Sequence, residues 1–559
     1  MKILGLSCYY HDSAAAAVTD AGIAFALQEE RASRLKNDSR FPVLAIARAL
    51  EFCKTSINDF EDIVFYETPE IKLQRLWGQI LDDWPNSRGL FFERVPYFIH
   101  HKYPIERQIR ESLNYRGTVS LCEHHRSHAA AAFYTSPFER AAVLTVDGVG
   151  EFDTTAVWIG EGNALRKVRS IRFPDSLGLF YSVFTQYLGF EVNEGEYKVM
   201  GLAPYGEPRF YDRIVGPVLR LHGDGSFSLD RRFFRFSDSE RHYSDHLTRH
   251  LGIPPRARGS AMTQAHQDLA ASVQKALEAA LANIVRSVIA EYTIRDFCFA
   301  GGVALNCTAN AALIREFSIR SHIHPAAGDA GGALGAALDL AVKRERSGEV
   351  KRFAFSPYLG VAHSDVIIEA SLRINGLAFR RAENVAEEIA EALASGKVVA
   401  IVHGRDEWGP RALGGRSILA DPRPAEMKEH LNAKIKFREE FRPFAPVVME
   451  EFYADWFETL GMAASPHMLY THRSIAAARV PAVSHVDGTS RAQTVSREQN
   501  PYLYDILAAF NRRTGTPVLI NTSFNLKGEP NVSSPTDALK TFYASGIDVL
   551  AIENYLLFK

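Results

Sequence analysis

One pattern of short strand-like segments and acidic turns occurs twice in the first third of the chain, and it constrains the fold more than any other feature. The first copy has such segments at residues 3–7, 13–19 and 23–31. The second copy has them at residues 141–146, 154–160 and 164–173. Asp12 and Asp147 lie in the first turn of each copy. The repeat favours a duplicated domain, although two unrelated hairpins would give the same pattern.

The rest of the chain alternates between helical and strand character. Up to residue 344, helices are predicted over 44–53, 263–292, 304–316 and 327–344, and a strand over 296–302. Beyond residue 355, helices are predicted over 382–396, 502–515 and 536–546, and strands over 397–404, 516–523 and 548–558. A charged, glycine-containing stretch at 345–356 predicts a boundary. We therefore expect two α/β regions, at 1–350 and 355–559.

Composition argues against several classes of function. The 559 residues include 64 Lys plus Arg and 66 Asp plus Glu, a net charge of −2, so no overall field would hold nucleic acid. No uninterrupted apolar stretch reaches the roughly 18 residues of a membrane span. The five cysteines form no CxxC pair, which disfavours a disulfide framework or a cysteine zinc site and fits a cytoplasmic setting.

His124 and His128 are candidate metal ligands in the first region. Their i, i+4 spacing in an alanine-rich, helix-like segment would place both imidazoles on one helix face. Two such imidazoles can hold a divalent metal, but no glutamate lies between them as in the zinc-protease motif HExxH. Asp147 and Asp329, each in a glycine-rich turn, are candidate carboxylate ligands of the same ion. Two ordinary histidines and two turn aspartates are the alternative.

Two glycine-rich loops, at 300–306 and 327–335, each precede a predicted helix. Backbone N–H groups in such loops can approach phosphate oxygens at a helix N-terminus. Neither loop is a P-loop, because GK[ST] does not follow, and neither contains the dinucleotide-binding GxGxxG. Together with the repeated strands, the loops favour a nucleotide cleft between two halves of the first region.

The last third of the chain is rich in cations beside turns. These residues are Arg405, Arg411, Arg416, Lys434, Lys436, Arg438, Arg442 and Arg491. A guanidinium matches a pair of phosphate or carboxylate oxygens, whereas lysine supplies a point charge. The polar segment 521–525 follows a predicted buried strand, where α/β proteins often bind ligands. We favour a small-anion pocket over the alternative of a solvated or salt-bridged basic surface.

His11 and Asp12 form a polar pair in the first turn. The imidazole could act as a general base if a carboxylate oriented it. Neighbouring side chains usually point apart, so we expect Asp12 to be a poor orienter. An ordinary histidine beside a turn aspartate is an equal alternative.

Ten motifs together resemble a known family. They are HDSAAAAV, HHRSHAAAAFY, VDGVGEFDTT, SLGLFYSVFTQYLGFEVNEGEYKVMGLAPYG, GGVALNCTAN, GDAGGALGAAL, GRDEWGPRALGGRSILADPR, KFREEFRPFAPVV, HVDGTSRAQTV and NTSFNLKGEP. In this order, from residue 3 to about residue 535, they resemble the O-carbamoyltransferase family, which includes nodulation, cephamycin and tobramycin carbamoyltransferases. The resemblance implies an actin-like domain over 1–350, built as a duplicated ribonuclease H-like fold and akin to tRNA threonylcarbamoyladenosine synthase. It also implies a YrdC-like α/β domain over 355–559.

The resemblance further implies a reaction in two steps. In the C-terminal domain, carbamoyl phosphate and ATP would give a carbamoyladenylate through carbamate. In the N-terminal domain, a hydroxyl of a small-molecule acceptor, such as a natural product or glycoside, would then displace AMP. The family also implies a divalent metal, Fe(II), with Mg²⁺ accompanying ATP, and a homodimer.

The residue roles implied by the resemblance form four groups. The metal ligands would be His124, His128, Asp147 and Asp329. The nucleotide contacts would be Lys198, Gly301, Gly302, Asn306 and Asp147. The carbamoyl phosphate contacts would be Arg411, Lys436, Arg442, Arg491, Asn521 and Ser523. His11 would deprotonate the acceptor hydroxyl, and Arg411 and Lys436 would be the catalytic residues of the first step.

Three alternatives stay open at this point. A tRNA-modifying enzyme of the threonylcarbamoyladenosine type is disfavoured by the near-zero net charge, and its tRNA binding would weaken steeply with salt. A non-enzymatic, actin-like nucleotide-binding regulator would release no AMP, and the retained histidines and cations argue against it. A sugar kinase of the actin-like superfamily would release ADP instead.

Overall fold

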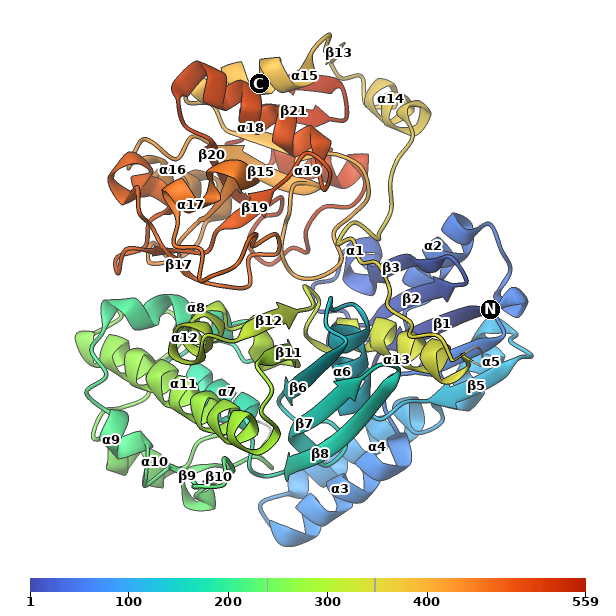
Figure 1. Cartoon of the computed structure of the whole chain (residues 1–559), viewed down its shortest axis with the longest axis vertical. Coiled ribbons are helices and arrows are strands. Elements are labelled where there is room, and N and C mark those ends of the chain that lie inside the picture. The colour runs from blue at the N-terminus through green and yellow to red at the C-terminus, as the bar shows by residue number, and fades with distance from the viewer. Residues whose placement is uncertain (239, 346–347) are drawn as a thin grey trace. The chain divides into compact units, whose positions relative to one another are not determined.

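The structure, a computed structural model, describes residues 1–238, 240–345 and 348–559, and the chain divides into two compact units (Figure 1). The first unit contains Met1–Ala24, Ser39–Pro42 and Cys53–Ala354. The second unit contains Phe25–Asp38, Val43–Phe52 and Phe355–Lys559. Two short N-terminal segments thus belong to the second unit, which the sequence pattern does not anticipate. Within the expected boundary at 345–356, residues 346 and 347 lie outside the described residues.

Two five-stranded sheets share one strand order. The first contains β1 (Lys2–Ser7), β2 (Ala14–Thr19), β3 (Gly22–Gln28), β4 (Asp62–Phe65) and β5 (Thr118–Leu121). The second contains β6 (Arg140–Val146), β7 (Asp153–Glu161), β8 (Ala164–Arg172), β11 (Asp296–Ala300) and β12 (Arg320–Ile323). Their orders are β3-β2-β1-β4-β5 and β8-β7-β6-β11-β12, and β1 and β6 are each antiparallel to one neighbour and parallel to the other. The predicted duplication is therefore confirmed.

Helices α6 (His124–Tyr134) and α13 (Asp329–Lys343) pack closely together in the first unit. Gly335 of α13 permits this approach, because a Cβ atom there would lie 1.8 Å from the carbonyl oxygen of Ser127 in α6. The alanine-rich and glycine-rich sequences thus allow the two backbones to come close. As a result, Asp329 at the start of α13 lies beside α6.

Further helices accompany the second sheet of this unit. They are α7 (Leu177–Tyr187), α8 (Glu196–Leu202), α11 (Gln264–Tyr292) and α12 (Cys307–Phe317). The long helix α11 packs against α8 and α12 (Figure 1). The predicted helices at 263–292 and 304–316 are confirmed, although the second begins with a 3-10 turn, η6 (Gly302–Leu305).

An eight-stranded mixed sheet forms the centre of the second unit. Across the sheet, its strands are β13 (Arg380–Arg381), β22 (Tyr555–Phe558), β21 (Val549–Ile552), β14 (Val399–Val402), β15 (Arg416–Ala420), β20 (Val518–Ser523), β16 (Ala445–Met449) and β19 (Gln493–Val495). One core contains residues of α15 (Val385–Ala394) and α18 (Pro501–Thr514), and another contains residues of α14 (Asp365–Ile374), α16 (Met427–Leu431) and α19 (Pro535–Tyr543). Alternate residues of β14 belong to the two cores, so helices cover both faces. The predicted α/β class is confirmed.

Two predicted strands are wrong in part. The segment 23–31 is a strand only to Gln28, because Glu29–Ser33 forms helix α1, which α2 (Val43–Cys53) follows. The segment 548–558 is not one strand but the hairpin of β21 and β22. Glu553 in its turn has a φ of 50°, which a continuous strand does not allow.

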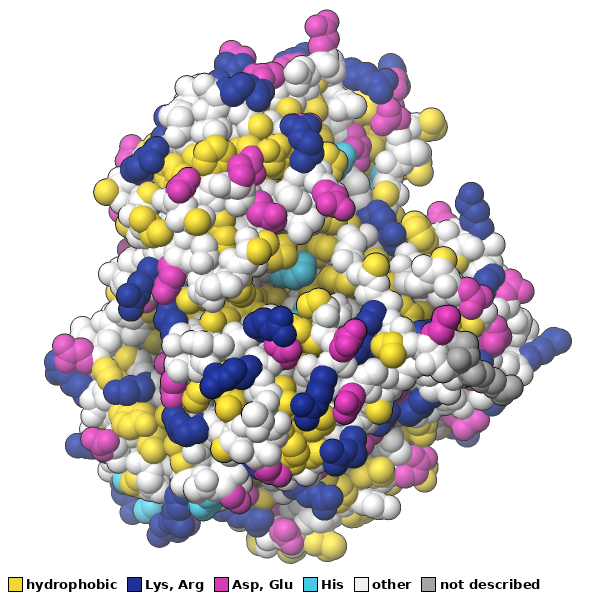
Figure 2. All heavy atoms as spheres, in the orientation of Figure 1, with side chains coloured by type: hydrophobic (Ala, Val, Ile, Leu, Met, Phe, Trp, Pro, Cys, Tyr) yellow, Lys and Arg dark blue, Asp and Glu magenta, His cyan; other side chains and the backbone are white. Residues whose placement is uncertain are grey.

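Charged side chains of both signs are intermixed on the face of each unit that Figure 2 shows. This distribution agrees with the formal net charge of −2. In the part of the chain that the structure describes, no helix combines the length and the hydrophobicity that a membrane crossing requires.

Candidate functional site

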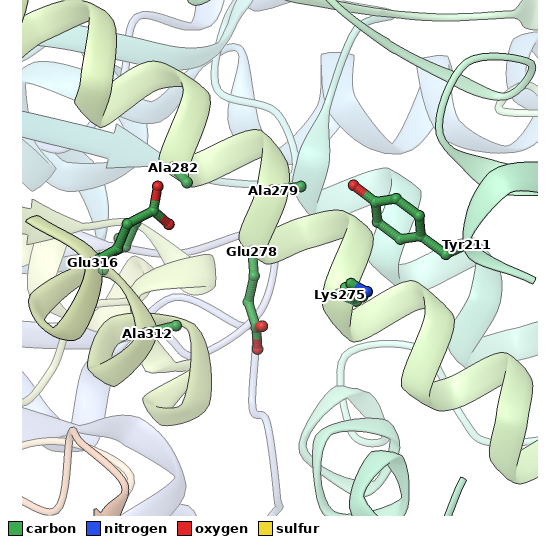
Figure 3. A pocket seen from close by; sticks show the side chains of 8 residues that line it. Tyr211, Lys275, Glu278, Ala279, Ala282, Ala312 and Glu316 are labelled. Atoms are coloured by element: carbon green, nitrogen blue, oxygen red, sulfur yellow. The ribbon is translucent and has the colours of Figure 1, made fainter. Parts of the chain in front are cut away.

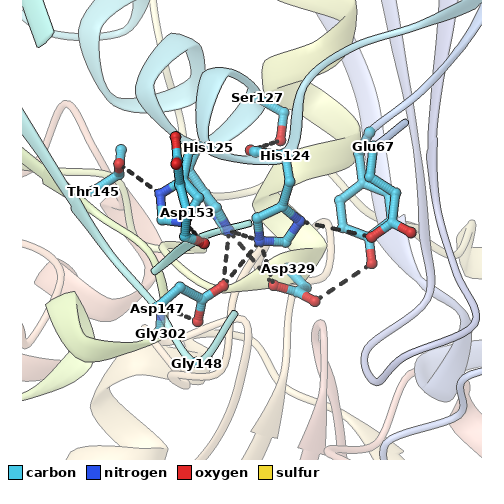
Figure 4. Close-up of polar contacts among 12 residues, drawn as sticks. Glu67, His124, His125, Ser127, Thr145, Asp147, Gly148, Asp153, Gly302 and Asp329 are labelled. Atoms are coloured by element: carbon cyan, nitrogen blue, oxygen red, sulfur yellow. Dashed lines mark hydrogen bonds and ion pairs between the residues drawn. The ribbon is translucent and has the colours of Figure 1, made fainter. Parts of the chain in front are cut away.

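Four buried side chains converge on one point of the first unit (Figure 4). They are His124 and His128 of α6, Asp147 after β6 and Asp329 of α13. Their nearest ligand-type atoms all lie within 4.8 Å of one another. The i, i+4 spacing does place both imidazoles on one helix face, with 3.1 Å between their Nε2 atoms. The structure thus brings together the four residues that the sequence predicts as metal ligands.

The donor set of this cluster fits a divalent cation. Asp147 Oδ2 lies 3.0 Å from His124 Nε2 and 3.3 Å from His128 Nε2. Asp329 Oδ1 lies 3.5 Å from His128 Nε2, and it accepts no hydrogen bond from the described residues. Imidazole nitrogens and carboxylate oxygens around one point are the ligands that Zn²⁺, Fe²⁺ and similar ions take.

The electrostatics of the cluster favour a positive charge at its centre. Burial alone would lower the pKa of His128, but its contacts with Asp147 and Asp329 outweigh burial and raise that pKa to about 9. Burial would raise the pKa of Asp147, but hydrogen bonds with His124 and His128 hold it well below its usual range. The cluster is therefore a concentrated negative site, which a proton or a divalent cation can neutralise.

A buried ionic group that the sequence analysis missed lies beside the cluster. Glu67 follows β4, and its Oε2 lies 3.9 Å from His124 Nδ1. The same carboxylate lies 2.9 Å from Lys72 Nζ and 2.6 Å from Lys102 Nζ. Burial would raise the pKa of Glu67, but the two lysines lower it to about 2. The charged carboxylate therefore acts on the His124 imidazole electrostatically, since 3.9 Å is too long for a hydrogen bond.

His11 reaches the edge of the cluster from the turn between β1 and β2. Its Nε2 lies 3.9 Å from Asp329 Oδ2. Its Nδ1 lies 3.0 Å from Asp12 Oδ2, and Asp12 has a positive φ of 53°. The expectation that these neighbouring side chains point apart is therefore wrong, and Asp12 can orient the imidazole. Burial would lower the pKa of His11, but Asp329 and Asp12 raise it to about 9.

The glycine-rich loop after β11 adjoins the cluster. Gly301 has a φ of 88°, and a Cβ atom there would lie 2.2 Å from the Val146 carbonyl oxygen, so a larger residue does not fit. The Gly302 N–H donates to Asp147 Oδ1 at 3.2 Å. The structure thus joins three of the predicted nucleotide contacts, Gly301, Gly302 and Asp147.

Asn306 and Lys198, the other two predicted nucleotide contacts, have protein partners. Asn306 Oδ1 accepts the Ala309 N–H at 3.0 Å and caps α12. The amides of Asn306 and Gln274 also exchange two hydrogen bonds, each of 3.0 Å. Lys198 Nζ lies 5.6 Å from the centre of the Phe190 ring. The roles of Asn306 and Lys198 toward a nucleotide stay predictions.

A pocket of about 200 Å³ lies between α11 and α12. It is lined by Tyr211, Lys275, Glu278, Ala279, Ala282, Ala312, Leu313 and Glu316 (Figure 3). Glu278 links it to the predicted nucleotide residues, because it accepts a hydrogen bond of 2.8 Å from Gln274, the partner of Asn306. Burial raises the pKa of Glu278. No residue predicted from the sequence lines this pocket.

In the second unit, predicted anion-binding residues meet at the end of β20. Asn521 and Ser523 lie in the last three residues of this strand. Lys436 ends a π-helical turn, η7 (Asn432–Lys436), and its Nζ lies 3.3 Å from Ser523 Oγ and 2.9 Å from Asn525 Oδ1. It also donates to the Ser523 carbonyl oxygen. The structure therefore brings Lys436 and Ser523 together.

Lys436 carries the strongest sign of an anion site. It is 5 % exposed, and its hydrogen-bond partners among the described residues are neutral oxygens and not carboxylates. Burial and the nearby charges of Arg438 and Arg442 hold its pKa well below the usual range. A buried amine among neutral oxygens and other cations is stabilised in its charged form by an anionic ligand.

The loop 404–416 carries Arg411 and is organised by Glu407. Glu407 Oε1 accepts hydrogen bonds of 2.7–3.0 Å from the backbone N–H groups of Leu413, Gly415 and Arg416. Asn521 joins this loop to β20, because its Nδ2 donates to the Ala412 carbonyl oxygen at 3.2 Å. The loop that holds Arg411 is thus tied to a second predicted carbamoyl phosphate contact.

Asn521 also connects β20 to the segment that contains Arg491. Its Nδ2 lies 2.7 Å from Gln493 Oε1, and Gln493 lies two residues after Arg491. Arg442 forms an ion pair of 3.6 Å with Glu439. The predicted roles of Arg442 and Arg491 toward carbamoyl phosphate stay predictions.

Arg405 and Arg416, two of the cations grouped with the pocket, hold backbone together instead. Arg416 is fully buried, and its Nε lies 2.8 Å from Asp406 Oδ1. Arg405 Nε donates to the Gly360 carbonyl oxygen at 3.0 Å, and its guanidinium lies 4.1 Å from the centre of the Phe52 ring. Arg416 is therefore a buried, ion-paired residue, and Arg405 joins backbone and an aromatic ring.

Two family descriptions and several relatives match this chain. Residues 2–338 match Carbamoyltransferase N-terminus, and residues 390–559 match Carbamoyltransferase C-terminus. Nodulation protein NolNO of Sinorhizobium fredii is 37% identical over 99% of this chain and 79% of its own length. Nodulation protein NolO of Bradyrhizobium diazoefficiens is 39% identical over 78% of each chain. An uncharacterized protein of Synechocystis sp. is 40% identical over 100% of this chain and 96% of its own length.

Proposed function

Because the chain belongs to the carbamoyltransferase family and is a carbamoyltransferase, we propose that it is an ATP-dependent O-carbamoyltransferase with one reaction step in each unit. The observation that carries the proposal is the presence of two different polar centres. The first unit holds a His/Asp cluster with His11 at its edge. The second unit holds Lys436, a buried amine that contacts no carboxylate among the described residues.

The first step, in the second unit, forms the activated carbamoyl group. Water cleaves carbamoyl phosphate to carbamate and phosphate. A carbamate oxygen then attacks the α-phosphorus of ATP, so that a carbamoyladenylate forms and pyrophosphate leaves. Four cations, Arg411, Lys436, Arg442 and Arg491, bind the phosphoryl oxygens, where negative charge increases in the transition state. Asn521 and Ser523 supply neutral donors and acceptors for the carbamoyl group.

The second step, in the first unit, transfers the carbamoyl group. The acceptor hydroxyl oxygen attacks the carbamoyl carbon, the bond from this carbon to the phosphate oxygen breaks, and AMP leaves. His11 Nε2 takes the hydroxyl proton when the imidazole is neutral, a form that a cation beside Asp329 would favour by offsetting the carboxylate charge that raises its pKa, and Asp12 holds the imidazole through Nδ1. The adenylate is a reactive mixed anhydride that water would hydrolyse. Keeping it inside the protein until the acceptor is bound would protect it.

The His/Asp cluster would hold a divalent metal, Fe(II) by analogy with the family, through His124, His128, Asp147 and Asp329. Such an ion would neutralise phosphate charge and polarise the anhydride. Gly302 and Gly301 would bind the nucleotide next to Asp147, with Lys198 and Asn306 as further contacts, and Mg²⁺ would accompany ATP. We further propose a cytoplasmic homodimer, domains at 1–350 and 355–559, and a natural product or glycoside as the acceptor.

Product analysis tests this proposal. The purified chain, given ATP and carbamoyl phosphate, should release pyrophosphate, and AMP should appear when a hydroxylated acceptor is added. A screen of hydroxylated compounds for the mass gain of one carbamoyl group would identify the acceptor. Release of ADP would point to a kinase instead. Salt-dependent tRNA binding would point to tRNA modification.

A further inference from the structure

The N-terminal segment of the second unit contains a buried and incompletely bonded arginine. Arg31, in α1, is 2 % exposed. Its Nη2 donates to the Gly409 carbonyl oxygen at 3.0 Å. Its Nε lies 3.9 Å from Glu30 Oε1, which is too far for a hydrogen bond. Neither Nε nor Nη1 has a hydrogen-bond acceptor among the described residues.

A second buried arginine of the same unit shows what a purely structural role looks like. Arg416 uses every guanidinium nitrogen, because Nε, Nη1 and Nη2 all donate to backbone carbonyl oxygens, and Nε also faces Asp406. Arg31 satisfies only one of its three nitrogens in this way. Guanidinium groups stay protonated, and buried charges need partners, so the spare donors of Arg31 suit an anion.

The position of Arg31 identifies the site that it adjoins. Gly409, its acceptor, lies two residues before Arg411 in the loop 404–416. Glu407 holds the same loop through three backbone N–H groups. The Arg31 side chain therefore contacts the loop that carries a proposed carbamoyl phosphate contact.

The protein holds the Arg31 segment firmly in the second unit. Arg34, at the end of α1, donates to the carbonyl oxygens of Asn531 at 2.6 Å and Pro530 at 3.0 Å. The Ala26 N–H donates to the Leu359 carbonyl oxygen at 3.1 Å. Contacts on both sides of Arg31 thus fix α1, which pre-organises the guanidinium for binding.

We propose that Arg31 is a further cation of the anion site in the second unit, supplied by the N-terminal segment, and that it binds phosphoryl oxygens. This inference rests on the proposed function, which places carbamoyl phosphate and ATP in that unit. Both substrates offer phosphoryl oxygens, and these oxygens can accept hydrogen bonds from the guanidinium N–H groups that the described part of the protein leaves without an acceptor. A domain cut at residue 355 would lack this residue.

The test compares Arg31→Lys and Arg31→Met with a control from the other N-terminal segment of the second unit. Arg48→Met is the control, because Arg48 lies in α2, is 51 % exposed and forms an ion pair with Glu51. Calorimetry measures the affinity for inorganic phosphate, and pyrophosphate release gives KM separately for carbamoyl phosphate and for ATP. Arg31→Lys keeps the charge and most of the volume, so it remains informative if Arg31→Met does not fold.

We expect Arg31→Lys to weaken phosphate binding by about tenfold or more, because the point charge of lysine replaces the planar guanidinium. Arg48→Met should bind phosphate like the wild type. A raised KM for carbamoyl phosphate alone would assign the anion to that substrate, and a raised KM for ATP alone would assign it to the nucleotide. Unchanged phosphate affinity and unchanged KM values in Arg31→Lys would overturn the inference. If phosphate binding depends on Arg31 but the wild type releases no pyrophosphate, the inference holds and the proposed function fails.

Discussion

The two units each place a buried lysine at the end of a π-helical turn, but in opposite electrostatic settings. Lys102 ends η3 (Phe98–Lys102) in the first unit, and Lys436 ends η7 (Asn432–Lys436) in the second. Lys102 Nζ lies 2.6 Å from the Glu67 carboxylate, so although burial lowers its pKa to about 8, Glu67 offsets part of that effect. Lys436 contacts neutral oxygens, and its pKa is held well below the usual range.

This difference indicates a structural role for Lys102 and a ligand-binding role for Lys436. The charge of Lys102 is neutralised by a carboxylate of the protein, and the ion pair holds Glu67 beside the His/Asp cluster. The charge of Lys436 has no such partner among the described residues, so an anionic ligand would stabilise it. Burial and residue type are the same in both cases, and the presence of a carboxylate decides the role.

The largest effect is expected from Lys436→Ala. Removing this cation should slow carbamoyladenylate formation by about 10³-fold, because transition-state charge on the phosphates loses a buried donor. Transfer from preformed carbamoyladenylate to the acceptor should stay near the wild-type rate. Lys434→Ala is a matched control, because Lys434 lies exposed in the same turn. Pyrophosphate release and carbamoyl transfer measure the two steps, and an equal loss in both would refute the division between the units.

The complementary change is Asp329→Asn in the first unit. It should remove the bound divalent metal and slow carbamoyl transfer by about 10²-fold, while pyrophosphate release continues. Metal analysis of the purified protein and the two half-reactions measure this outcome. His125→Gln is the control, because His125 lies on the same helix but bonds Thr145 and the Asp153 carbonyl oxygen, each at 2.8 Å. A full metal content in Asp329→Asn would exclude Asp329 as a ligand.

Local patterns in the sequence were sufficient for the duplication and for the four-residue cluster. Turn residues and short apolar runs specify strands locally, and the i, i+4 spacing specifies a helix face. Topology then brings Asp147 and Asp329 to that face; both were already candidates because each lies in a glycine-rich turn, and the resemblance to a known family implies the same role. Glu67 could have been found, because this acidic residue lies two positions after the end of a buried strand.

Other features depend on tertiary packing and leave no local signal. Arg31 ends a segment predicted as a strand and Lys102 lies in no predicted element, so neither was a candidate site residue, although their exposures are only 2 % and 1 %. Residues 25–38 belong to the second unit because of contacts such as the hydrogen bond from Arg34 to the Asn531 carbonyl oxygen. These two residues are separated by almost the whole chain. Periodicity reports which face of an element is apolar, not which distant segment covers it.

Stability measurements should distinguish the two lysines again. Lys102→Met should destabilise the protein by about 2 kcal/mol, because it leaves the Glu67 carboxylate buried with Lys72 alone. Lys436→Met should change stability by less than about 1 kcal/mol, since loss of an unpaired buried charge offsets its lost hydrogen bonds. Urea denaturation followed by fluorescence measures both. Equal destabilisation by the two substitutions would contradict the comparison.

The smallest expected effect is the pH dependence of anion binding by Lys436, with sulfate as a probe that does not titrate near neutral pH. Lys436 binds an anion in its protonated form, and a bound sulfate should raise the pKa that burial, Arg438 and Arg442 lower in the free protein. At pH values between the pKa of Lys436 in the free protein and its pKa with sulfate bound, the binding of sulfate is accompanied by the uptake of a proton. Sulfate affinity should therefore fall as pH rises through this window, by about tenfold per pH unit at most.

The lowered pKa of Lys436 also makes the stability of the free protein depend on pH. A base with a lowered pKa in the folded state binds more protons when it is unfolded, so the stability of the free protein should rise with pH in this window. The neighbouring Arg438 and Arg442 stay charged throughout and cannot produce the effect. Calorimetry in two buffers of different ionisation enthalpy counts the protons taken up, and Lys436→Met should take up none. An affinity that rises with pH, or proton uptake that persists in Lys436→Met, would show that another group binds the anion.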